Sequence, residues 1–201
     1  IAEPLDAQGI AIVLGPGAAD FEAPLSECSP AHVHAVLDAG QSLWESVALS
    51  DAGGGVRLRH DSLRAFIAET PALAATREDA QRRLVRVAAR WAETPIGTQV
   101  RAHFLRSGSA YTCAWGNETR KQALFQQWTS FTYWQARTAE LPMRDLEGLL
   151  SDVVTVGQMP GAPQSLGVWA AWLRDRIPML RRGTPEWPAN RILLQLAVEH
   201  A

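Results

Sequence analysis

The sequence predicts a mainly α-helical protein in which a small winged-helix (α+β) unit precedes an all-helical array. Apolar residues recur at helical spacing over most of the 201-residue chain. Only around Val56 and Leu58, which alternate with Arg57 and Arg59, does the pattern match a strand with one buried face. From residue 96 onward every periodic segment is helical. We therefore expect a winged-helix-like domain at residues 1–95 and a helical linker or arm domain at residues 96–201.

The first elements of this unit are marked by glycine and proline. An apolar run at residues 10–14 meets Gly15, Pro16 and Gly17, which would stop any helix there. Ser29 and Pro30 form a good helix start, with the serine as the cap. Behind them we expect one helix of about five turns. Its buried face is predicted to contain Val33, Val36, Leu37, Gly40, Leu43, Trp44 and Val47.

A strand-to-helix corner is predicted at His60 and Asp61. A Gly-rich turn at residues 51–55 leads into the strand, and the apolar residues after the corner then recur at helical spacing. Those residues are Leu63, Phe66 and Ile67. Unpaired N–H groups at a helix start attract anions, so such a corner can serve a phosphate. Taken alone, the pair is better interpreted as a surface or packing histidine followed by an aspartate that caps the helix.

The remaining segments are predicted to be helical. The next helix is expected to begin with a capping box at residues 76–79 and to end at Pro95. Residues 107–109 are interpreted as a helix-breaking loop, residues 157–165 as a second loop, and Pro178 as a helix end. A last helix follows Pro188. The apolar stripes between these points are Val100, Phe104 and Leu105; Leu124, Trp128, Phe131 and Trp134; Met143, Leu146, Leu149, Leu150 and Val153; and Trp169, Trp172 and Leu173.

Composition excludes several classes of protein. A formal net charge of −2 provides no general attraction to nucleic acid or to an anionic membrane. The two cysteines allow no disulfide framework and no zinc spacing, which fits a reducing cytosol. No apolar run reaches transmembrane length, so we expect a cytoplasmic protein without membrane contact. Because the chain starts at Ile1 and ends within a helical run, we expect a piece of a longer protein.

No catalytic constellation is found, and we predict no catalytic residue and no metal ligand. Residues 15–17 lack the Lys-Ser/Thr ending of a phosphate loop, and a Gly-x-Ser-x-Gly motif is absent. His32 and His34 are two residues apart on a predicted helix, with Val33 facing inward between them, so they cannot share a metal. The acidic residues Asp145, Glu147 and Asp152 are assigned to a solvated helix face.

Arginines crowd the helix that follows the corner. They are Arg77, Arg82, Arg83, Arg86 and Arg90, with Arg57, Arg59 and Arg64 nearby in sequence. A winged helix would read DNA through the helix that starts at Ser29, yet that helix carries Asp38 and Glu45 and no cation. We therefore do not expect nucleic-acid binding, and we assign the arginines to a solvated face or to docking on an acidic neighbouring domain.

The segment Leu-Arg-His-Asp-Ser-Leu-Arg-Ala-Phe at residues 58–66 resembles the Met-His-Asp corner of the winged-helix domain in NB-ARC and NACHT-type signalling NTPases, the STAND class. Arg59 precedes the histidine here, with Leu58 one place further back. Residues 124–152 resemble the helical linker of bacterial members. Residues 187–197 are similar to the segment just before the WD-repeat propeller that often follows. The resemblance covers most of residues 30–201.

This resemblance implies a non-catalytic regulatory fragment that relays nucleotide state between an NTPase module and a sensor domain. In that family the corner histidine contacts the phosphate of ADP bound to the preceding NTPase module and locks the resting form. Carried over, His60 would contact the nucleotide and Asp61 would order the corner through backbone N–H groups. The fragment itself would hold no cofactor, with ADP or ATP bound in a parent ATPase. Its partners would be those intramolecular domains and other proteins, with oligomerisation of the parent on activation.

Two other classes of protein stay open. One is a winged-helix DNA-binding regulator with a helical ligand or dimerisation domain. The other is a helical protein-interaction scaffold that binds through an aromatic face. The scaffold interpretation would gain if Trp128, Trp134, Trp169 and Trp172 were exposed together.

Overall fold

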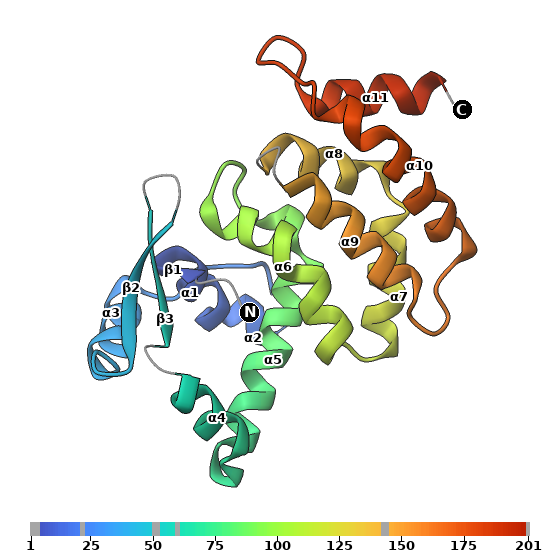
Figure 1. Cartoon of the computed structure of the whole chain (residues 1–201). Coiled ribbons are helices and arrows are strands. Elements are labelled where there is room, and N and C mark those ends of the chain that lie inside the picture. Colours follow the sequence, from blue (N-terminus) through green and yellow to red (C-terminus); the bar gives the residue numbers. More distant parts are fainter. Residues whose placement is uncertain (1–4, 21–22, 50–52, 59–60, 142–144, 200–201) are drawn as a thin grey trace. The chain divides into compact units, whose positions relative to one another are not determined.

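The computed structural model describes residues 5–20, 23–49, 53–58, 61–141 and 145–199 (Figure 1). The chain divides into two compact units, Ile1–Tyr111 and Thr112–Ala201. The division lies within helix α6 (Gln99–Trp115), whereas the sequence pattern placed a boundary at the turn before that helix. The described residues are mainly helical, which confirms the mainly α prediction. None of the described helices is long and apolar enough to cross a membrane.

The first unit contains a small antiparallel sheet and the first helices. Its elements are β1 (Leu5–Asp6), α1 (Ala7–Leu14), α2 (Pro16–Ala19), α3 (Pro30–Ala39), β2 (Trp44–Leu49), β3 (Gly53–Leu58), α4 (Asp61–Glu69), a 3₁₀ turn (Pro71–Leu73), α5 (Ala74–Ala89), a second 3₁₀ turn (Trp91–Glu93) and α6. The strands lie in the order β1-β3-β2, with Val56 opposite Leu5 and Leu58 opposite Trp44. The strand expected at Val56 is therefore the central one, and it already includes Gly53.

Helix α3 starts as predicted but is much shorter than predicted. The Ser29 hydroxyl accepts a hydrogen bond from the His32 N–H, which caps the first turn. The helix then ends at Ala39, and Gly40 donates to the carbonyls of Val36 and Leu37 in a closing turn. Residues 44–49 form β2 instead, because their pairing with β3 overrides a helical spacing that a glycine had interrupted.

Two other helix boundaries of this unit also differ from the prediction. Helix α5 begins at Ala74, directly after the first 3₁₀ turn, so Thr76 lies inside the helix and caps nothing. Residues 107–109 lie within α6 and do not break it. A Cβ atom on Gly108 would stand 3.1 Å from the Cβ atom of Ala88, so the glycine permits a close approach of α6 to α5.

The second unit is helical throughout its described residues. Its elements are the end of α6, α7 (Glu118–Trp128), α8 (Phe131–Glu140), α9 (Leu146–Gly157), α10 (Gln164–Leu180) and α11 (Ala189–Glu199). The loop expected at residues 157–165 is confirmed to within two residues, since α9 ends at Gly157 and α10 begins at Gln164. The helix expected to end at Pro178 continues to Leu180, because a proline in the last turn removes only one backbone hydrogen bond.

The single aromatic helix predicted from Leu124 to Trp134 is in fact two helices. Helix α7 ends at Trp128, and Thr129 donates through its hydroxyl to the Phe125 carbonyl. Across the turn, the indole N–H of Trp134 donates to the Trp128 carbonyl at 2.7 Å. The Trp134 side chain of α8 thus donates to a backbone carbonyl that has no helical partner at the end of α7. Both tryptophans lie in the core of this unit, 0% and 2% exposed.

Candidate functional site

The predicted phosphate-contacting residue, His60, lies outside the described residues, and so does Arg59. Both flanks of the corner are described. Strand β3 ends at Leu58 and helix α4 begins at Asp61 (Figure 1), so only residues 59 and 60 separate the two elements. The predicted change from strand to helix at this point is confirmed. Asp61 is the first residue of α4, and whether it orders the corner remains a prediction.

The strand that leads into the corner is the best-supported strand of the sheet. β3 pairs along its whole length with β2 and at Val56 and Gly55 also with β1. The pairing on both sides is limited to Gly55 and Val56, whereas Arg57 and Leu58, next to the corner, pair with β2 alone. The corner therefore follows the central strand of this sheet, at an end that is hydrogen-bonded on one side.

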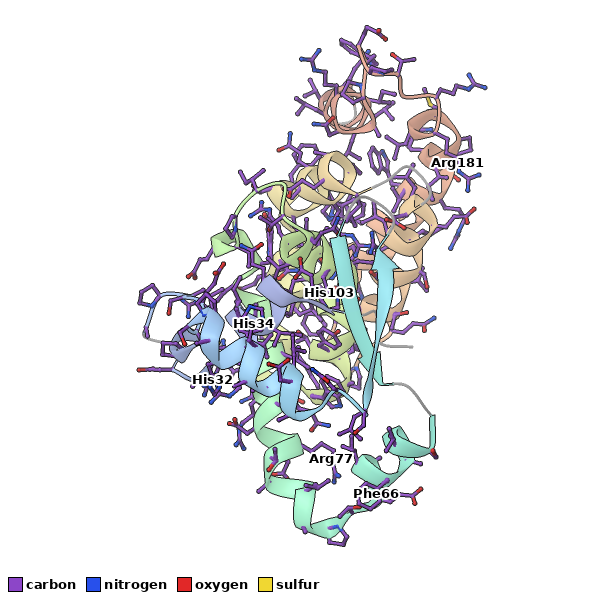
Figure 2. The ribbon with its side chains drawn as sticks, turned by 90° about the vertical axis from the view of Figure 1, so that its left-hand side faces the viewer. His32, His34, Phe66, Arg77, His103 and Arg181 are labelled. Carbon is purple, nitrogen blue, oxygen red and sulfur yellow. The ribbon has the colours of Figure 1, made fainter. Side chains whose placement is uncertain are left out.

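Helix α4, on the other side of the corner, is fastened to α5 by one arginine. The Arg77 guanidinium donates through Nη1 to the carbonyl of Ile67 at 2.7 Å. That carbonyl lies in the last turn of α4, where backbone acceptors lack helical partners and a cation is favourable. Figure 2 shows Arg77 on α5 beside the short helix that carries Phe66. Phe66, which was expected in the apolar stripe of this helix, is 60% exposed, and no side chain of α4 that the structure describes is fully buried.

Three further arginines bind backbone carbonyls near the ends of α1 and α2, two of them in α5 and the third directly after it. Arg83 Nη1 lies 3.4 Å from the Leu14 oxygen, at the end of α1. Arg86 Nη1 lies 3.3 Å from the Ala18 oxygen, in α2. Arg90 Nη1 donates to the carbonyls of Gly17 at 3.2 Å and Ala23 at 2.7 Å. The prediction that these arginines form a solvated or domain-docking face is therefore wrong for these three.

The carboxylates beside these arginines are local partners on α5 or just after it. Asp79 accepts from Arg83 at 2.7 Å, and this bond holds the pKa of Asp79 below its usual value. Glu93 accepts from Arg90 at 2.6 and 2.7 Å, a two-point ion pair that likewise lowers the pKa of Glu93. Arg82, whose side chain is 60% exposed, lies 3.3 Å from Asp79 and faces outward.

The histidines of α3 form no metal site. Both side chains are exposed, while Val33 between them is 4% exposed, which confirms the predicted arrangement (Figure 2). Among the described residues, no group of three or more His, Cys, Asp or Glu side chains is placed to hold a metal ion.

A buried histidine that the sequence pattern did not single out lies in α6. His103 is 5% exposed, and its Nε2 pairs with the Tyr111 hydroxyl at 2.8 Å. Its Nδ1 has no hydrogen-bond partner among the described residues. Burial, reinforced by the nearby Arg106 cation, lowers the pKa of His103 to about 4, so the ring is neutral at physiological pH. The neutral, buried ring of His103 meets Phe104 edge to face at 5.2 Å and is part of the core of the first unit.

In the second unit an ion pair joins α8 to α9. The Arg137 side chain is 1% exposed, its Nη1 donates to Asp152 at 2.5 Å, and its guanidinium lies 5.5 Å from the Trp128 ring. Burial raises the pKa of Asp152 above its usual value, while the arginine acts in the opposite direction. The assignment of Asp152 to a solvated face is therefore wrong. Glu147, 72% exposed and paired with Arg181, does lie on such a face.

The aromatic face required by a scaffold does not form. Trp128 and Trp134 are buried, and Trp169 and Trp172 are half-buried, in a chain of ring contacts that runs through all four. The four tryptophans are therefore core anchors, so the scaffold interpretation does not gain from them.

No protein-family model, curated protein or solved structure matches this chain. The assignment of a function therefore depends on the geometry described above.

Proposed function

We propose that this chain is a regulatory region of a STAND-type signalling NTPase, in which the corner at His60 and Asp61 responds to nucleotide bound on an adjoining NTPase module. The observation that carries the proposal is the change from β3 to α4 across residues 59 and 60. A histidine there stands ahead of a helix start, whose free N–H groups favour an anion. Asp61 is the residue proposed to order that corner.

The order of elements around the corner supports a winged-helix assignment for this unit. Helix α3 precedes the β2–β3 hairpin, and the second strand of the hairpin also pairs with β1 from the start of the chain. The recognition helix of a DNA-binding winged helix needs cations, whereas α3 has no Lys or Arg. The arginines Arg83, Arg86 and Arg90 are bound to backbone carbonyls. These facts favour a signalling role over a DNA-binding role.

A mechanical connection runs from the corner to the rest of the unit. Arg77 ties the last turn of α4 to α5, and Arg83, Arg86 and Arg90 tie α5 to the segment that ends α1 and forms α2. A displacement of the corner that moves α4 would therefore also move α5, together with α1 and α2. In the proposed mechanism ADP favours one arrangement of the domains through its contacts at His60, and loss of those contacts releases the other arrangement.

The test is His60→Ala in the full-length protein. We expect this variant to retain less ADP through purification and to signal more strongly without stimulus. Nucleotide content is measured by anion-exchange chromatography after denaturation, and signalling by the output of the parent protein. His32→Ala and His34→Ala, two exposed histidines of α3, serve as matched controls. Unchanged ADP retention and unchanged basal signalling in His60→Ala would refute the proposal.

A further inference from the structure

Helix α11 has two apolar faces, of which only one is packed. Ala189, Leu193 and Leu196 are at most 6% exposed and face the helices α8 and α10. On another side, Leu194 is 44% and Val198 is 70% exposed. A helix that needs only one face for its own unit leaves the second face available to a partner.

The exposed face forms a continuous stripe that begins just before the helix. Trp187, 49% exposed, is followed by Arg191, Leu194 and Val198 at spacings of four, three and four residues. This spacing places one residue per turn along a single line and is typical of a seam between two helices. Together with Gln195, these four residues line a shallow, mainly apolar hollow. We call Trp187, Arg191, Leu194 and Val198 the α11 stripe.

One cation lies in the middle of the α11 stripe. The Arg191 guanidinium is 6.0 Å from the Trp187 ring and donates to the Glu186 carbonyl at 3.3 Å. No carboxylate among the side chains that the structure describes forms an ion pair with it. An arginine held over an aromatic ring presents a planar fork that matches a carboxylate.

We propose that the α11 stripe binds an amphipathic partner helix that carries an Asp or Glu among its apolar residues. Apolar side chains of the partner would cover Trp187, Leu194 and Val198, and its carboxylate would pair with Arg191. This inference concerns the second unit alone and goes beyond the proposed function, because it does not involve the corner at His60.

Charge argues for this partner over a second copy of the chain. Two α11 stripes paired in parallel would place Arg191 against Arg191, and an antiparallel pair would place it against Leu194. Either arrangement buries a guanidinium with no carboxylate opposite, which costs several times more than one ion pair returns. A bilayer is also a poor occupant, because membrane-bound helices carry several cations beside the apolar face.

The experiment uses two labelled helical peptides of 21 residues, designed with leucine at every seam position except one. The exceptional central position is Glu in one peptide and Lys in the other. We expect the Glu peptide to bind the chain, by fluorescence anisotropy, at least about tenfold more tightly than the Lys peptide. Arg191→Glu should reverse this preference. The matched control Arg174→Glu, an exposed arginine of α10 outside the stripe, should leave it unchanged.

Leu194→Asp and Val198→Asp complete the test, since both side chains are exposed and neither substitution disturbs the core. Each should abolish binding of the Glu peptide while circular dichroism stays that of the parent chain. Equal affinity for the two peptides, or binding that survives both substitutions, would overturn the proposal. So would a dimer in sedimentation that Leu194→Asp dissociates, because the occupant would then be a second copy. Binding to anionic vesicles that the same substitution abolishes would overturn it too.

Discussion

Acidification from pH 7 to pH 5 should destabilise the chain through His103. The ring is buried in α6, where it pairs with Tyr111 and lies near the Arg106 cation. Burial and that cation lower the pKa of His103 from 6.5 to about 4. In the unfolded chain the same ring regains the ordinary pKa of a histidine, so acid favours the unfolded state.

The sign and size of the effect follow from this difference in pKa. Because the pKa is depressed in the folded state, the stabilising contribution is present above pH 6.5 and is lost as the pH falls towards 4. In that range the unfolded chain binds the additional proton, so the free energy of unfolding falls with falling pH. Integration between pH 7 and pH 5 yields a loss of about 2 kcal/mol.

Urea unfolding at the two pH values measures this loss, with circular dichroism as the signal. His103→Gln keeps a polar partner for Tyr111 and removes the titration, so the stability gap between parent and variant should narrow by about 2 kcal/mol from pH 7 to pH 5. His32→Gln and His34→Gln are controls, because both side chains are exposed on α3. A gap that is the same at both pH values would show that His103 does not titrate in the predicted way.

Three further predictions concern two helical glycines and the buried ion pair. Gly108→Val should destabilise the chain by roughly 1–3 kcal/mol, because a Cβ atom there would already stand 3.1 Å from the Cβ atom of Ala88. Gly167→Ala, at a helical glycine with open space around it, should instead stabilise the chain by up to about 1 kcal/mol. Urea unfolding measures both changes, and midpoints that shift in the same direction would contradict the packing argument. Asp152→Asn should cost about 3 kcal/mol by leaving the buried Arg137 without its counter-charge, and the double variant Arg137→Met/Asp152→Leu should recover most of that loss. If the double variant is no more stable than Asp152→Asn, the loss in Asp152→Asn does not come from an unpaired buried charge, and this reasoning is refuted.

Local signals in the sequence predicted the helix starts and stops that depend on local chemistry. Ser29 and Pro30 mark the start of α3, and Gly15 marks the end of α1. The change at Asp61 was also predictable, because alternation and helical spacing meet there. Such signals act over a few residues, so a single sequence contains them in full.

The elements that were missed depend on contacts between distant residues. Strand β1 exists through its pairing with Val56 and Gly55, some fifty positions away along the chain. The apolar residues of β2 continue the helical spacing of the segment before it, and the segment is a strand because it pairs with β3. Glycine on average disfavours helices, yet Gly108 lies within α6 and permits a close contact with Ala88 of α5. That contact depends on the packing of the two helices, which the sequence alone does not show.

The arginines of α5 show why the candidate site was only partly predictable. Arg83, Arg86 and Arg90 follow the i, i+3, i+7 spacing of one helix face, which indicates a common target. Their acceptors are backbone carbonyls of residues 13 to 23. Every residue has a backbone carbonyl, so the sequence does not indicate which of them accept these bonds. A basic helix face therefore looks the same in sequence whether it meets phosphates, an acidic domain or helix ends. Here carbonyls near the helix ends accept from these arginines. The same bonds join α1 and α2 to α5, which Arg77 in turn joins to the last turn of α4.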